Sequence, residues 1–385
     1  MASKNIIRIL VTGGCGFVGG AIVNGLLERH SEWRISVLDL QIPKPDVLAK
    51  LEHFFEADIT STEEVGHAFA SYMPDLVVHT AGVVPARQSR YSTREKDWER
   101  VKRINYEGSR HILDATVASG CRRFVYTSSA TVAVDDLEHD YYYMDETVPL
   151  GFATLHYGRS KYMAEQYVFD PKHAEIGLIA CALRPCMIFG PGDTAVIAVM
   201  HDLIAKGETS FIVGDGDNLY DFLYIDNAVE AHVLAVENLL SSRTAAGQAF
   251  FISNQEPVYF WDFLAFVWVQ FGHSPGRKIH IPTGVALGFG TLLEWYSWLT
   301  GAVATMDTGS VKDGIKTAYS NNDKAKMILG YVPRVRLAAG VRLACEVRYT
   351  KISRKVVVAL TVAKDYKQLL ARPVPLPDGT GFTKS

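Results

Sequence analysis

The sequence predicts an α/β fold in which a doubly wound parallel sheet carries helices on both faces. From Ile6 to about Phe251, apolar strand-like runs alternate with longer helical patterns. Alternation of this kind builds a parallel sheet with right-handed crossovers. Two further observations agree with this class, since a glycine-rich turn directly follows the first run and an acidic residue, Asp39, closes the second.

The elements follow one another regularly along this part of the chain. Helical patterns run through Leu27, near 62–72, and over 98–119 and 157–170. The strand-like runs between them are apolar enough to be buried on both faces, as strands of a parallel sheet are. These runs are IIRILVTGG (6–14), RISVLDL (34–40), DLVVHTAG (75–82), RRFVYTSS (122–129), GLIACALRP (177–185) and QAFFISN (248–254).

A smaller portion is expected to leave the sheet at loops dense in proline and glycine, such as 190–193. The end of the chain, 372–385, contains three prolines and two glycines, which predicts poor order there. The predicted parts are a nucleotide-binding domain (1–189 and 225–255), a discontinuous substrate-binding portion (190–224 and 256–345) and a C-terminal extension (346–385).

Composition excludes several classes of protein. The chain has 385 residues, is 48% hydrophobic and carries a formal net charge of −3, which supports a full core and excludes a disordered chain. The charge and the lack of a long basic run offer no general attraction to nucleic acid, so no such partner is expected. The cysteines have no metal-ligand spacing, and we expect reduced thiols and no metal site. They are Cys15, Cys121, Cys181, Cys186 and Cys345.

One segment, 281–304, stands apart because its 24 residues include a single charge, Glu294. It is long enough to span a bilayer, yet three structures fit it: an interfacial helix, a buried helix of the substrate pocket, and a true span. The central Glu294, Pro282 near its start and the aromatic pair Trp295 and Trp298 favour the interfacial helix first and the span last. We therefore expect peripheral membrane contact.

The glycine-rich turn predicts a dinucleotide site of the Rossmann type. Glycines permit a tight turn and a close approach of backbone to pyrophosphate, whose charge lies at the positive N-terminus of the following helix. Asp39, some 20 residues later, is placed to accept hydrogen bonds from the adenosine ribose and to repel a 2′-phosphate. NAD is therefore the expected cofactor, in preference to NADP. The turn residues expected to contact it are Gly13, Gly16, Phe17, Val18 and Gly19.

Tyr157 and Lys161 are the candidate catalytic pair. Four residues apart on a helix, their side chains leave one face about 5–6 Å apart. A fixed ammonium and a positive nicotinamide ring both favour the phenolate, which can take a proton from a substrate hydroxyl while hydride leaves the same carbon. Ser129, at the carboxyl end of a predicted strand, precedes the tyrosine by 28 residues, and such strand ends hold ligands in doubly wound sheets.

With these motifs the chain resembles the extended short-chain dehydrogenase/reductase superfamily through about residue 345. The resemblance implies that Ser129 binds the reacting oxygen, with Thr127 and Ser128 as alternatives. It also implies cofactor contacts from the turn Thr80-Ala81-Gly82 and from Lys161. Further implied cofactor contacts come from the pair after the third strand, from the central helix and from the loop near the nicotinamide, namely Asp58, Ile59, Asn105 and Pro185.

Within the superfamily, ALRPCMIFGPGD (182–193) and FIVGDGDNLYDFLYIDNAVEAHVLA (211–235) resemble the 3β-hydroxysteroid dehydrogenase family, and most of all its decarboxylating sterol-4α-carboxylate branch and triterpenoid-processing relatives. The resemblance implies a sterol or triterpenoid substrate, NAD-dependent oxidation at C3 and loss of a C4 carboxylate. UDP-sugar enzymes are the main rivals, but many carry Arg before an Asp-Phe pair, where this chain has Tyr220.

Two further functions remain compatible with the sequence. They are a 3β-hydroxysteroid dehydrogenase/isomerase without decarboxylation and a non-catalytic NAD(P) sensor. We expect the protein at the cytosolic face of the endoplasmic reticulum membrane or in the cytoplasm, and a homodimer is compatible with either place. The chain departs from the family in a longer, more basic loop, 84–99, in which Arg87 or Arg90 could hold a substrate carboxylate, and in its extension past Tyr349.

Overall fold

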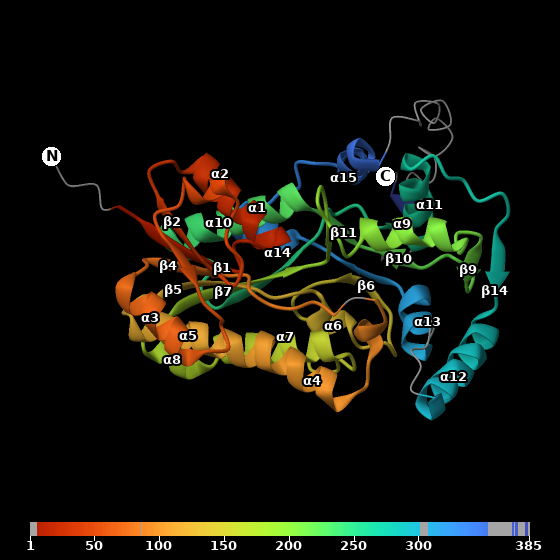
Figure 1. The fold of residues 1–385 in the computed structure, drawn as a ribbon, viewed down its shortest axis with the longest axis horizontal. Helices are drawn as coiled ribbons and strands as arrows, with labels where there is room; N and C mark the ends of the chain where they lie inside the picture. The colour runs from red at the N-terminus through yellow and green to blue at the C-terminus, as the bar shows by residue number, and fades with distance from the viewer. Residues whose placement is uncertain are drawn as a thin grey trace.

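A seven-stranded parallel sheet forms the centre of the computed structural model, which describes residues 6–85, 87–300, 307–352, 372, 374–375 and 382–383 (Figure 1). The predicted doubly wound α/β class is confirmed. In spatial order the strands are β12 (Gln248–Ile252), β7 (Ile179–Pro185), β5 (Arg123–Thr127), β4 (Leu76–His79), β1 (Arg8–Thr12), β2 (Arg34–Asp39) and β3 (Phe54–Glu56).

Helices cover both faces of this sheet because alternate residues of each strand face opposite sides. In β1, Ile9 and Val11 belong to the apolar core on one face, and Leu10 belongs to the core on the other. The first face carries α1 (Phe17–Arg29), α2 (Pro45–Leu48), α10 (Ile225–Leu240) and α14 (Asp323–Leu329) (Figure 1). The second carries α3 (Thr62–Ser71), α4 (Glu95–Lys102), α5 (Gly108–Ala118), α7 (His156–Val168) and α8 (Pro171–Glu175).

A second, four-stranded sheet lies beyond the carboxyl ends of the large one. Its order is β13 (Val258–Tyr259), β10 (Leu219–Tyr220), β15 (Ala318–Ser320) and β6 (Tyr141–Met144). Its core includes Phe222 and Phe263, whose rings stack 3.6 Å apart. Nearby are the paired strands β8 (Met187–Phe189) with β11 (Phe222–Tyr224), β9 (Phe211–Val213) with β14 (Ile279–Ile281), and the helices α6 (Thr131–Val134), α9 (Ile197–Lys206), α11 (Phe260–Gln270) and α15 (Leu337–Ile352). The domain boundaries stay a prediction.

The apolar segment forms α12 (Thr283–Thr300), which packs against α13 (Thr308–Ile315) at the periphery (Figure 1). The single charge of this segment has a local partner, because Glu294 accepts hydrogen bonds from both the backbone N–H and the hydroxyl of Thr308 at 2.7 Å. Large apolar side chains of α12 are 55–64% exposed, which does not fit a buried pocket helix. They are Val285, Phe289, Leu292, Trp295, Tyr296 and Leu299.

Among the helices that the structure describes, none combines the length and the apolar character that crossing a bilayer requires. The expectation of poor order over 372–385 falls mostly outside the described residues. The exceptions are Arg372 and the paired strands β16 (Val374–Pro375) and β17 (Phe382–Thr383).

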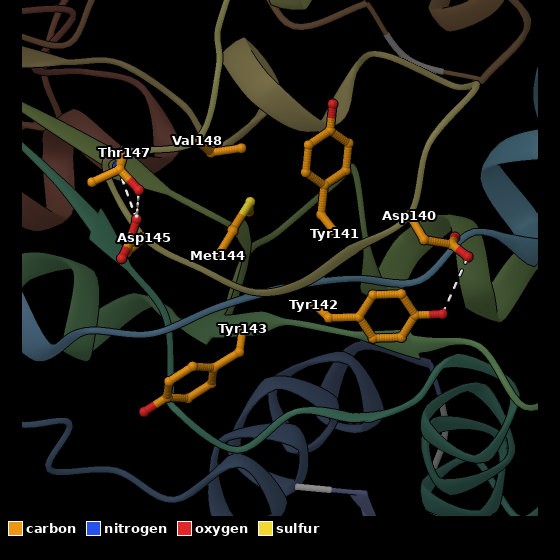
Figure 2. Close-up of a pocket in the computed structure, with 8 residues that line it drawn as sticks. All are labelled: Asp140, Tyr141, Tyr142, Tyr143, Met144, Asp145, Thr147 and Val148. Carbon is orange, nitrogen blue, oxygen red and sulfur yellow. Dashed lines mark hydrogen bonds between the residues drawn. The ribbon is translucent and has the colours of Figure 1, made fainter. Parts of the chain in front are cut away.

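Strand β6, which the sequence patterns did not predict, borders a surface pocket of about 330 Å³ (Figure 2). Ala318 and Ser320 of β15 pair with Tyr141 and Met144, so β6 carries one extra residue, and Tyr143 has a positive φ of 47°. The bulge places Tyr142 and Tyr143 on the side of the strand opposite to Tyr141 (Figure 2). None of the predicted site residues lines this pocket.

Candidate active site

The glycine turn after β1 fits closely against the turn after β4. Gly13 has a φ of +71°, and a Cβ there would lie 2.7 Å from the backbone of Ala81. A Cβ on Gly19 would lie 2.1 Å from the carbonyl oxygen of Gly13 and 2.5 Å from the hydroxyl of Thr80. Only glycine fits these two positions, so the close approach of the two turns explains why the sequence has glycine at both.

The N-terminus of α1 is open to an anion. Its N-cap, Gly16, provides no capping side chain, and the first turn, which begins Phe17-Val18-Gly19, contains no acidic residue. The first N–H groups of this 13-residue helix therefore have no side-chain cap and no acidic residue within their own turn, and the helix dipole adds positive potential. These residues fit the pyrophosphate of a dinucleotide.

Asp39 closes β2 beside this turn. One carboxylate oxygen accepts the N–H of Cys15 at 2.9 Å, and the other accepts the N–H of Gln41 at the same distance. Both oxygens keep free lone pairs, so the fixed carboxylate can still accept ribose hydroxyls. The predicted adenine neighbours lie in the loop after β3. Asp58 accepts the N–H of Thr60 at 2.8 Å, while the buried side chain of Ile59 packs against α5.

Asn105 joins the turn after β4 to the helix of the catalytic pair. It lies in η2 (Arg103–Glu107), a π-helical turn between α4 and α5. Its amide N–H₂ donates to the carbonyl of Val83 at 2.9 Å and to the hydroxyl of Ser160 at 3.1 Å, and its amide oxygen accepts the N–H of Val83 at 2.7 Å. All its polar atoms are therefore engaged in holding these elements together, and π turns of this kind are frequent at functional sites.

The structure brings Tyr157, Lys161 and Ser129 together. Tyr157 and Lys161 lie one turn apart on α7 and are 8% and 4% exposed, and the Ser129 hydroxyl lies close enough to the phenol to lower its pKa. The Lys161 ammonium donates to the carbonyl of Thr127 at 2.8 Å and lies 3.7 Å from where a Cβ on Gly82 would stand. The ammonium thus lies between the strand end of β5 and the turn after β4.

Burial is the largest cause of the pKa shifts of Tyr157 and Lys161. It raises the pKa of Tyr157 to about 12, against the lowering effect of the Ser129 hydroxyl, and it lowers the pKa of Lys161 to about 8. Desolvation disfavours the charged form of each group. A cation bound next to the phenol would favour the phenolate, so a positively charged nicotinamide ring would supply what the protein alone lacks.

The two residues before Ser129 use their hydroxyls elsewhere. Ser128 donates to Glu165 at 2.5 Å, and Glu165 forms a buried ion pair with Arg184. The Thr127 hydroxyl lies 3.0 Å from Nε2 of His232, whose Nδ1 faces a carbonyl oxygen and must donate, so Thr127 is the donor to Nε2. The hydroxyls of Thr127 and Ser128 therefore both form hydrogen bonds with buried side chains of the core. Pro185 closes β7 beside them, and its carbonyl accepts the N–H of Ala130 at 2.9 Å.

Sequence reasoning missed two residues at this site. Nothing in the sequence singles out Asp135, and the sequence suggests Arg90 only as a substrate ligand. In the structure they form a bidentate ion pair, and Asp135 also accepts the N–H of Gly158, next to Tyr157. The only sequence signal is the unusually basic loop that contains Arg90. Among the residues described, no group of three or more His, Cys, Asp or Glu side chains is placed to hold a metal ion.

Comparison with solved structures shows the same fold in sugar-nucleotide enzymes. UDP-glucose 4-epimerase from Thermotoga maritima, solved with UDP-glucose, superimposes with a TM-score of 0.68 at 25% identity and covers 90% of this chain and 100% of its own. UDP-glucose 4-epimerase of Thermus thermophilus, solved with NAD, gives a TM-score of 0.66 at 23% identity and covers 89% of this chain and 98% of its own.

Comparison of sequences places the chain more narrowly. Residues 10–283 match the model of the 3-beta hydroxysteroid dehydrogenase/isomerase family. The decarboxylating sterol-4-alpha-carboxylate 3-dehydrogenase of Schizosaccharomyces pombe is 34% identical over 334 residues, 86% of this chain and 94% of the relative. Its namesake from Saccharomyces cerevisiae is 30% identical over 349 residues, 88% and 97% of the two chains. The chain therefore belongs to the 3-beta hydroxysteroid dehydrogenase/isomerase family.

Proposed function

We propose that the protein uses NAD to oxidise the 3β-hydroxyl of a sterol or triterpenoid and that the C4 carboxylate is then lost as carbon dioxide. The observation that carries the proposal is the buried group of Tyr157, Ser129 and Lys161 beside an open glycine turn. Support for the substrate class comes from the fungal relatives, whose names specify sterol-4-alpha-carboxylates and decarboxylation.

The proposed residues divide the chemistry among them. NAD, when bound, supplies the hydride acceptor. Tyr157 takes the proton of the C3 hydroxyl, and Ser129 holds the reacting oxygen by a hydrogen bond to it. Lys161 carries a positive charge one turn along α7 from Tyr157, and its position near Gly82 suits a contact to the cofactor ribose. Gly13, Gly16, Phe17, Val18 and Gly19 would hold the pyrophosphate, and the remaining cofactor contacts predicted from the sequence complete the site.

Loss of the carboxylate needs no further catalytic group. Oxidation at C3 turns a 4-carboxy-3-hydroxysterol into a β-keto acid. Its new carbonyl accepts the electron pair released when the bond between C4 and the carboxylate breaks, so carbon dioxide leaves and an enol remains. A proton then returns to C4 and gives the ketone. The only oxidant in the sequence of steps is NAD, which is reduced once for each carbon dioxide released.

The rival sugar-nucleotide function is disfavoured by charge. Tyr220 occupies the place before the Asp-Phe pair, and its hydroxyl donates to the carboxylate of Asp313 at 3.3 Å. The phosphates of a nucleotide sugar at this place would meet a neutral phenol, already bonded to Asp313, in place of the arginine that many such enzymes carry. The positive charge that would bind the phosphates is therefore absent from this position.

The reaction is tested with NAD and a 4-carboxy-3-hydroxysterol. We expect one NADH for each molecule of ketone, and a product lighter than the starting acid by the carboxyl group, followed by absorbance and mass spectrometry. The matched substrate is the same sterol without the carboxylate, which would give NADH and a ketone of unchanged carbon number. NADH only from the sterol that lacks the carboxylate, or an enone with a shifted double bond, would reject decarboxylation in favour of a dehydrogenase/isomerase.

We also propose that α12 contacts the membrane surface from the cytosolic face of the endoplasmic reticulum. Five of its exposed apolar side chains recur at spacings of three and four residues, from Val285 through Phe289, Leu292 and Tyr296 to Leu299, and therefore lie along one face. Glu294 accepts hydrogen bonds from Thr308 of α13 and does not belong to that face, which therefore has no charged residue. An apolar face of this kind, which includes the aromatic residues Phe289 and Tyr296, suits the headgroup boundary of a bilayer and a lipid-like substrate.

Membrane contact is measured by sedimentation with phosphatidylcholine vesicles. Changing Leu292 and Trp295 together to Ser is expected to reduce vesicle binding by about tenfold or more, since burying each large apolar side chain contributes about 1.5–3 kcal/mol. Met327→Ser is the matched control, because Met327 is 79% exposed on α14 and should leave binding unchanged. Wild-type protein that stays wholly in the supernatant would contradict the proposal.

A further inference from the structure

Arg90 lies between two carboxylates that come from distant parts of the chain. It belongs to η1 (Arg87–Tyr91), in the basic loop after β4. Its guanidinium donates to the two oxygens of Asp135 at 2.6 and 3.1 Å and lies 3.9 Å from a carboxylate oxygen of Asp313. The Arg90 and Asp313 side chains are 18% and 12% exposed, and that of Asp135 is fully buried. Charge-assisted bidentate pairs of this kind fix geometry strongly.

The Asp135 side of this arrangement leads to the start of α7. The oxygen that binds Arg90 at 3.1 Å also accepts the N–H of Gly158 at 2.8 Å, so Asp135 serves as the cap that the N-cap residue, Leu155, does not provide. The carbonyl of Asp135 accepts both the N–H and the hydroxyl of Thr154. The first turn of the helix, which carries Tyr157, is thus positioned by one buried carboxylate.

The Asp313 side leads to the arm formed by α12 and α13. Asp313 lies on α13 and accepts the phenol of Tyr91 at 2.8 Å, so Arg90 and its neighbour in the chain both meet the same carboxylate. The ring of Tyr91 also packs against the backbone of Gly309, where a Cβ would lie 3.0 Å away. Because Glu294 of α12 binds the first residue of α13, an unbroken set of contacts runs from α12 to Arg90.

We propose that Arg90 is a positioning residue for Tyr157, which fixes the start of α7 through Asp135 and joins it to the arm of α12 and α13 through Asp313. The inference rests on the proposed function, because it takes Tyr157 as the proton acceptor. Arg90 itself is not assigned to bind substrate. Its guanidinium already has two carboxylate partners, which also makes it a poor ligand for the carboxylate of a sterol acid.

The charges around the Tyr157 phenol predict the direction in which its pKa changes when Arg90 is replaced. Asp135 raises the pKa of Tyr157 and Arg90 lowers it, while Tyr126 faces the phenol from β5 and Lys161 lies one turn along α7. Removing the charge of Arg90 removes the contribution that lowers the pKa of the phenol, while the N–H of Gly158 still favours the charged form of Asp135, so the pKa of the phenol rises. The pH at which turnover increases must then move upward.

The experiment compares pH profiles of kcat and kcat/KM for wild type, Arg90→Gln, Arg90→Lys and Asp313→Asn, with NAD and the substrate that wild type oxidises. For Arg90→Gln we expect turnover at pH 7 to fall by about tenfold and the rise with pH to move upward by about one unit, since one pKa unit equals a factor of ten. Arg90→Lys should restore the position of the profile but not the full turnover, because lysine lacks the bidentate fork. Asp313→Asn should lower turnover without moving the profile, because Asp313 meets Arg90 and not the phenol.

The control is Arg100→Gln, which removes the same charge from an exposed position on α4 and should leave the profile unchanged. A profile of Arg90→Gln that superimposes on wild type overturns the proposal, as does a lysine variant no better than the glutamine one. If Arg90→Gln does not fold, Arg90→Lys decides, and full wild-type turnover of this variant, which lacks the bidentate fork, overturns the proposal. Full turnover of a Tyr157→Phe variant would instead reject the proposed function.

Discussion

Replacement of Tyr157 by Phe is expected to lower kcat by about 10²–10⁴-fold, the usual consequence of losing a positioned acid–base group. The phenyl ring still fills the buried site on α7, so the fold and the glycine turn are unaffected. The Lys161 ammonium keeps its bond to the carbonyl of Thr127. NAD affinity, measured by fluorescence titration, should therefore change little. The loss should appear in kcat, measured at saturating NAD.

The matched control for this variant is Tyr72→Phe. Tyr72 is also buried, at 3% exposure, and its hydroxyl donates to the carbonyl of Arg34, far along the chain from the catalytic pair. It should retain wild-type turnover. Near-normal turnover of the Tyr157 variant would contradict its role as proton acceptor, and equal losses in the two variants would assign the effect to packing.

Replacement of Asp39 by Ala is expected to lower kcat/KM for NAD by about 10–100-fold, because hydrogen bonds to a charged group contribute about 1.5–3 kcal/mol. The carboxylate is held in place by the N–H groups of Cys15 and Gln41, which gives it little freedom to adapt to a 2′-phosphate. The variant should also lose its discrimination against NADP, since the repelling charge is gone. Steady-state kinetics with the two cofactors measure both effects.

An exposed acid on α2 provides the control for the Asp39 variant. Asp46→Ala removes the same charge from the surface between β2 and β3 and should leave the cofactor preference unchanged. Wild-type protein that uses NADP as well as NAD would remove Asp39 from its proposed role. A variant that loses NAD without gaining NADP would limit that role to binding the ribose.

Much of the large sheet was predictable because its strands carry continuous apolar runs. All six predicted runs contain strands of the sheet, and the pattern over 157–170 matches α7 closely. The pattern over 98–119 reads as one helix, but the structure divides it at the π turn, which leaves no mark on apolar periodicity. Strand β6 escaped for a related reason, since the bulge at Tyr143 breaks the alternation that indicates a strand.

The candidate site was predictable where it is local in the sequence. Tyr157 and Lys161 are brought together by one turn of helix, and the glycines of the first turn by a few residues of loop. Arg90, Asp135 and Asp313 meet only through tertiary structure. The sequence suggests Arg90 only as a substrate ligand, and it singles out neither aspartate. No spacing rule connects residues so far apart, so their ion pairs could not be predicted from the sequence and are seen only in the structure.

The π turn at 103–107 lets α4 and α5 keep the directions of one continuous helix although it contains an extra residue, because the hydrogen bonds of a π turn run from residue i to residue i+5. Removing one residue there would therefore give an uninterrupted α-helix with little rotation of α4. Trp98 would keep its place between His156 and Arg159, whose ring and guanidinium lie 5.6 and 4.2 Å away. The change would instead fall on Asn105, so natural relatives without this asparagine are expected to be one residue shorter in this helix.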